Sequence, residues 1–171
     1  MSRAADDGDA GELAPGKRAM LRHAVATLAY RGSKAIRGAP PEFATFRASG
    51  SIRTPLQLVA HLGDLFDWGL SLAEGDQRWN VATPGSWDDE CARFFATLER
   101  FDEYLASDRP LGKPAERLMQ GPVADALTHV GQLTMLRRLA ETPVRSENFA
   151  VADIVAGRVT LDQTAPKYEF D

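Results

Sequence analysis

Apolar residues recur every three or four positions in several stretches of about 20 residues, and this spacing is the strongest constraint on the fold. The clearest stretch begins at Ser86-Trp-Asp-Asp89, which resembles a helix-capping box. Its apolar stripe consists of Trp87, Cys91, Phe94, Leu98, Phe101 and Leu105. Because residues three and four apart share one face of an α-helix, the stripe predicts an amphipathic helix.

Proline and glycine delimit three further helices. The stretches are 15–37, 54–74 and 121–141. Thr54 is a suitable N-cap with Pro55 at the first helical position. We expect Gly121-Pro122 to begin the last helix, with a short helical turn over 114–119 ahead of it.

Four amphipathic helices predict an all-α protein built as a four-helix bundle. The segment 144–171 has scattered apolar residues, which predict a short helix near 147–155 and then an extended, irregular path over the bundle. No alternation is long enough to predict a sheet. The length suits one domain over 14–171, preceded by a tail, 1–13, whose composition predicts mobility.

The net charge of −4 comes mostly from that tail, which holds four acidic residues and Arg3. Removing these from the 24 acids and 20 bases of the chain leaves 20 acids and 19 bases. A nearly neutral body without a basic block lacks the electrostatic pattern of a nucleic-acid-binding protein. No apolar run reaches the ~18–20 residues of a membrane helix.

A single cysteine, Cys91, cannot form an internal disulfide, which favours a reduced, cytoplasmic location. Because Cys91 lies on the apolar stripe of its helix, we interpret it as a small core residue rather than a nucleophile.

Three polar residues interrupt the apolar faces. His61 lies within the stripe Leu58-His61-Leu65-Trp68-Leu72, and Asp125 and His129 lie four residues apart on one face of another helix. A buried polar side chain is costly unless it is satisfied. Two imidazoles and a carboxylate that meet in a bundle core would form an open divalent-metal site. The alternative is structural: Asp125 would face the positive end of its helix dipole and pair with His129 one turn later.

The segments Leu56-Gln-Leu-Val-Ala-His61-Leu-Gly-Asp64-Leu and Asp125-Ala-Leu-Thr-His129-Val-Gly-Gln132-Leu resemble those of the DinB/YfiT-like superfamily. The resemblance covers roughly residues 15–141. It implies a four-helix bundle of up-down-down-up topology, a homodimer, and a divalent metal held by one His on the second helix and a His-x-x-x-His pair on the fourth. His61 and His129 match two of these ligands, and Gln132 matches the Gln that follows the pair. Asp125 stands where the first His is usual, and Val130 where an Arg is common, so the metal preference is open.

The resemblance implies an enzyme that uses Zn or Ni, and a low-molecular-weight thiol in the transferases, to act on a small molecule as a thiol S-transferase or hydrolase. The competing interpretation is a non-catalytic, stress-associated ligand-binding or scaffold dimer with a vestigial site. Gln132, Asp64 and Trp68 are the remaining candidates near the centre. Gln132 would bond to a ligand or across helices, Asp64 would support His61 or face solvent, and Trp68 would line a pocket or pack in the core.

Overall fold

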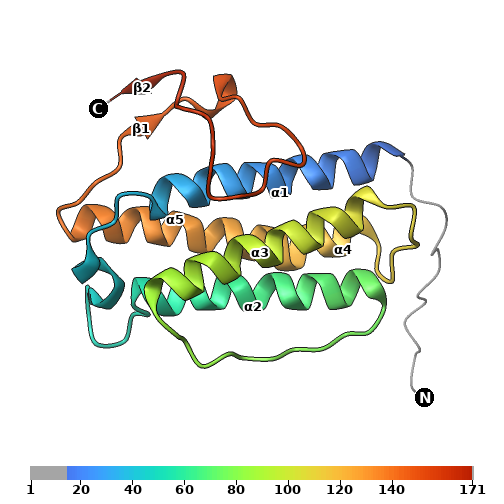
Figure 1. Ribbon diagram of the computed structural model, residues 1–171, viewed down its shortest axis with the longest axis horizontal. Helices are drawn as coiled ribbons and strands as arrows, with labels where there is room; N and C mark the ends of the chain where they lie inside the picture. Colours follow the sequence, from blue (N-terminus) through green and yellow to red (C-terminus); the bar gives the residue numbers. More distant parts are fainter. Residues whose placement is uncertain (1–14, 171) are drawn as a thin grey trace, which may run out of the picture.

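Four long helical segments pack side by side in the computed structural model, which describes residues 15–170 (Figure 1). The predicted mobile tail, 1–13, lies outside the described residues. The helices are α1 (Pro15–Ile36), α2 (Pro55–Glu74), α3 (Trp87–Ala106) and a final segment composed of α4 (Ala115–Leu118), the π-helical turn η2 (Met119–Val123) and α5 (Ala124–Leu139). The all-α four-helix bundle is therefore confirmed.

The direction of the helices follows from contacts at their ends. Arg18, near the start of α1, donates to the carbonyl of Ser107, just beyond the end of α3, at 3.0 Å. Arg137, near the end of α5, donates to the carbonyl of Ala35 at the end of α1. α2 and α3 run in the same direction, and the loop 75–86 returns along the length of α2 (Figure 1). The order is up-down-down-up.

Local sequence accounts for where α2 and α3 begin. Thr54 caps α2: its hydroxyl accepts from the Gln57 amide at 3.2 Å, and the Gln57 side chain accepts from the Thr54 amide at 2.9 Å. Ser86 and Asp89 form the same reciprocal capping box at α3. Each box satisfies backbone N–H groups that a helix start leaves without partners. α2 ends at Gly75, whose φ of 80° is in the left-handed region that glycine adopts without strain.

Aromatic rings fill the space between α2 and α3. Phe66 is fully buried and lies 5.6 Å from Phe101 and 6.3 Å from Phe94, measured between ring centroids. Burying one such ring stabilises the fold by roughly 1.5–3 kcal/mol. Cys91 is buried in the same core, as predicted.

The prediction that Gly121-Pro122 begins the last helix is wrong. The short helical turn predicted over 114–119 is present as α4, but it continues without a break into the last helix, so Pro122 lies inside the helix, within the π-turn. A π-turn relocates the backbone bonds that a proline disrupts. The proline ring is accommodated against α2 at Gly69, where a Cβ would lie 3.2 Å from it.

The Gly69–Pro122 contact also aligns α2 with α5. The two helices run in opposite directions (Figure 1). Two turns back along α2 from Gly69 is His61, and two turns forward along α5 from Pro122 is His129. The close approach of the helices therefore places these two histidines opposite each other.

The C-terminal segment covers α1 (Figure 1). The helix predicted near 147–155 is reduced to the three-residue 3-10 turn η3 (Phe149–Val151). Another 3-10 turn, η1 (Pro41–Thr45), follows α1 earlier in the chain. Contrary to prediction, β1 (Ser146–Glu147) pairs with β2 (Glu169–Phe170) as a two-stranded antiparallel sheet. Lys34 of α1 binds both strands to the bundle through ion pairs, 2.8 Å to Glu147 and 2.5 Å to Glu169. None of the helices within 15–170 is long and apolar enough to cross a membrane.

Candidate metal centre

The three predicted ligands come together. His61 of α2 and Asp125 and His129 of α5 each offer one ligand atom, and these atoms lie within 4.8 Å of one another. The two imidazole rings are 4.8 Å apart between centroids and nearly perpendicular, at 78°. Two helices therefore supply two nitrogens and one oxygen, a donor set that suits a divalent transition metal.

The centre is partly open to solvent. The His129 side chain is 12% exposed and that of Asp125 is 48% exposed. Bonds of ~2.1 Å to a tetrahedral ion would hold the ligand atoms ~3.4 Å apart, so the widest pair would close by up to ~1.4 Å on binding. The Asp125 oxygen and the His129 Nε2 atom already lie 3.4 Å apart, and half of the Asp125 side chain is unburied and can adjust on binding.

Gln132 fixes the orientation of His129. Its Oε1 atom lies 2.9 Å from the His129 Nδ1 atom, and because Oε1 can only accept, Nδ1 carries the proton. The Nε2 lone pair then faces the Asp125 carboxylate oxygen at 3.4 Å. Two acceptors at this distance repel each other unless a cation, either a proton or a metal ion, joins them. The donor set therefore fits a metal, with Gln132 holding the ligand tautomer.

His61 favours its neutral form. Burial lowers its pKa, and the neighbouring Arg53 and His129 lower it further, against the opposing effect of Asp125 and Asp64. Neutral imidazole is the form that binds metals, so the surroundings of His61 favour the protonation state that a ligand needs.

The helix dipole does not account for Asp125. Because the helix begins at Ala115, Asp125 lies well inside it, and the preceding residues Val123 and Ala124 have helical backbone angles. The dipole acts mainly within the first turn, where backbone N–H groups lack partners. The remaining structural explanation of Asp125 is its pairing with His129, one turn away on the same helix.

The other candidate residues have defined places. Gln132 bonds to His129 within α5 and not across helices. Asp64 is buried and pairs with Arg93 of α3 at 3.0 Å, while its negative charge still acts on His61. Trp68 is partly buried against the core, with its ring 5.7 Å from that of Trp79.

Trp79 is the residue beside the centre that the sequence did not reveal. It lies in the loop between α2 and α3, and its ring contacts the His61 ring at 5.9 Å and 78°. Helical spacing says nothing about a residue in a loop. The only signal was a tryptophan in a long, polar connection.

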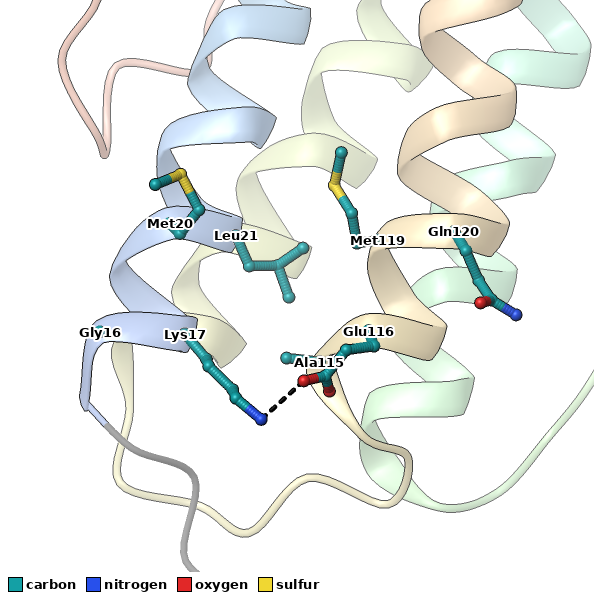
Figure 2. Close-up of a pocket in the computed structure, with 8 residues that line it drawn as sticks. All are labelled: Gly16, Lys17, Met20, Leu21, Ala115, Glu116, Met119 and Gln120. Atoms are coloured by element: carbon teal, nitrogen blue, oxygen red, sulfur yellow. Dashed lines mark ion pairs between the residues drawn. The ribbon is translucent and has the colours of Figure 1, made fainter.

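An apolar groove of about 350 Å³ lies apart from this centre, between the start of α1 and α4 (Figure 2). Met20, Leu21 and Met119 line it, and Lys17 and Glu116 form a 2.6 Å ion pair at its edge. It shares no residue with the His61–Asp125–His129 cluster.

The cluster is thus the arrangement in the described chain with the clearest chemistry. No protein-family model, no curated protein and no solved structure matches this chain.

Proposed function

We propose that this protein is a divalent-metal-dependent enzyme of the DinB-like type, in which His61, Asp125 and His129 hold the ion. The observation that carries the proposal is the convergence of three donors from α2 and α5 within 4.8 Å. Imidazole and carboxylate donors suit Zn, Ni or Fe, and Zn or Ni is the choice that the resemblance implies. The resemblance of the two ligand-bearing segments to the DinB/YfiT-like superfamily supports the same conclusion.

Thiol transfer suits the centre better than hydrolysis. A bound divalent ion would lower the pKa of a thiol or of water and so supply a nucleophile at neutral pH. A hydrolase also needs a residue to move the proton of the water, and Asp64, the buried carboxylate whose charge acts on His61, is held by Arg93. A thiol, with an ordinary pKa near ~8.5, ionises without such a base. We therefore favour a thiol S-transferase that takes a low-molecular-weight thiol and a small-molecule substrate.

In this proposal the chain's own residues have separate roles. Asp125 supplies the negative charge that balances the ion, and Gln132 keeps the His129 Nε2 atom free to bind it. Asp64 and Arg93 hold the loop beside the centre, since the Asp64 carboxylate also accepts from the Ala82 amide at 3.4 Å. We further propose that the protein works as a homodimer in the cytoplasm.

A second function has its own support. The exposure of Asp125 and its pairing with His129 are also what a vestigial site would show. The chain would then be a non-catalytic ligand-binding or scaffold dimer.

Metal analysis of protein purified without an affinity tag tests the proposal. We expect about one Zn or Ni per chain, and loss of the ion in a His129→Ala variant, because neither remaining donor can replace the nitrogen. His23→Ala is the matched control, since His23 is an exposed histidine on α1 outside the cluster. The same sub-stoichiometric content in all three proteins would contradict metal binding.

A cobalt-loaded sample separates the two functions. A small thiol such as 2-mercaptoethanol should produce a thiolate-to-cobalt charge-transfer absorption that His129→Ala lacks. Full loading with cobalt and no such absorption would favour the non-catalytic function.

A further inference from the structure

Trp79 and Trp68 form an aromatic surface next to the candidate metal centre. Their rings are 5.7 Å apart between centroids and perpendicular, at 89°, and Trp79 also contacts the His61 ring. We call the two rings the aromatic corner. Trp68 lies two turns after His61 on α2, so the corner extends from the centre along the helix.

The loop holds Trp79 by its backbone on both sides. The Ser71 hydroxyl accepts from the Arg78 amide at 3.1 Å and lies 3.2 Å from the Arg78 carbonyl oxygen. Three residues after Trp79, the Ala82 amide donates to Asp64. These polar contacts fix the backbone on both sides of Trp79, and the ring itself lies against His61 and Trp68.

Burial of the indole does not explain why a tryptophan stands here. Trp79 is 48% exposed, so much of its apolar surface faces water. An aromatic face left open beside a cluster of metal-binding groups is typical of a ligand site, where apolar surface surrounds a few polar groups.

The charges near the centre indicate what kind of ligand fits. Arg53 is exposed and its positive charge acts on His61, while the negative charges of Asp125 and Asp64 act against it. A bound divalent ion would add two positive charges to this balance, so the loaded centre would attract an anionic donor group and repel a cationic ligand.

We propose that the aromatic corner receives the planar ring of a ligand whose anionic donor group binds at the candidate metal centre. The substrate class is thus an aromatic or similarly flat molecule with an ionised oxygen or sulfur donor. The proposal rests on the proposed function, because the donor group needs the metal.

Two hydroxamates with the same donor group test the corner on zinc-loaded protein by calorimetric titration. Benzohydroxamate carries a ring and acetohydroxamate a methyl group. We expect benzohydroxamate to bind about tenfold more tightly, as stacking on indole and the apolar area it covers would produce. In a Trp79→Ala variant this preference should fall to about threefold or less, with the affinity for acetohydroxamate unchanged.

Val81→Ala is the matched control, because Val81 is an exposed residue of the same loop. A Trp79→Leu variant keeps apolar bulk and should also lose the preference. The proposal is overturned if Trp79→Ala retains the preference, or if it weakens both hydroxamates equally, since the residue would then act only on the loop. Wild-type protein that holds zinc but binds both probes equally overturns the corner alone, whereas protein that takes up no zinc overturns the proposed function as well.

Discussion

Removing the Asp64 carboxylate should destabilise the bundle without emptying the metal centre. Asp64 is 5% exposed in its side chain and pairs with Arg93, which is itself only 25% exposed. Removing one partner of a buried ion pair costs ~3–5 kcal/mol, because the other charge is left without compensation. Arg93 keeps its 2.8 Å bond to Glu90 and its 2.6 Å bond to the Ala60 carbonyl. We therefore expect Asp64→Ala to cost about 2 kcal/mol, below the range for a lone buried charge.

Asp67 offers a matched control on the same helix. It pairs with Arg100 of α3 at 2.6 Å, but the two side chains are 44% and 54% exposed. Solvent screens such a pair, so Asp67→Ala should cost less than about 1 kcal/mol.

Thermal unfolding followed by circular dichroism measures the difference. For a chain of this length ~1 kcal/mol shifts the Tm by ~2–4 °C, so Asp64→Ala should lower the Tm by ~4–8 °C and Asp67→Ala by at most ~4 °C. The zinc dissociation constant of Asp64→Ala should change less than about threefold, because Asp64 is not a ligand and Arg93 offsets most of the charge with which it acts on His61. Equal Tm shifts in the two variants, or a tenfold weaker binding of zinc by Asp64→Ala, would refute this account of Asp64.

Three further outcomes follow from the packing. Burial raises the pKa of Cys91 to about 12, so the thiol stays protonated at pH 8. Iodoacetamide should therefore label Cys91 only after the protein unfolds. Labelling of the native protein at the rate of a free thiol would contradict the burial of Cys91 in the core. Gly112→Ala should destabilise the protein by ~1–3 kcal/mol or more in urea unfolding, because the new Cβ would lie 2.2 Å from the Gly75 backbone. An unchanged urea midpoint would refute that close approach. Gly131→Ala should instead stabilise α5 by ~0.5–1 kcal/mol, since a Cβ there meets no atom within 4 Å. A lower urea midpoint for Gly131→Ala would contradict this open position.

Helical spacing and capping were sufficient to predict most of the fold from the sequence. The stripe from Trp87 to Leu105 and the capping residues Thr54 and Ser86 determine where α2 and α3 lie, because these signals act within one helix. The last helix was predicted to start too late because a proline usually marks a first turn. Pro122 is tolerated inside a helix by a π-turn and by packing against Gly69, which lies 53 positions earlier in the chain.

The ligand residues could be proposed from the sequence because each stands on an apolar stripe or one turn from another ligand. Their surroundings could not. The pairing of Asp64 with Arg93 joins residues 29 positions apart on different helices, and Trp79 reaches His61 through a loop whose path no periodicity describes. The two-residue strands are likewise too short for any alternation to be visible.

Anomalous diffraction from crystals of the zinc-loaded protein, recorded at the zinc absorption edge, tests the central claim most directly. We predict one anomalous peak per chain, ~2.0–2.2 Å from a nitrogen of His61, from Nε2 of His129 and from a carboxylate oxygen of Asp125. A peak bound by the two histidines with Asp125 beyond bonding distance, or no peak between α2 and α5, would contradict it.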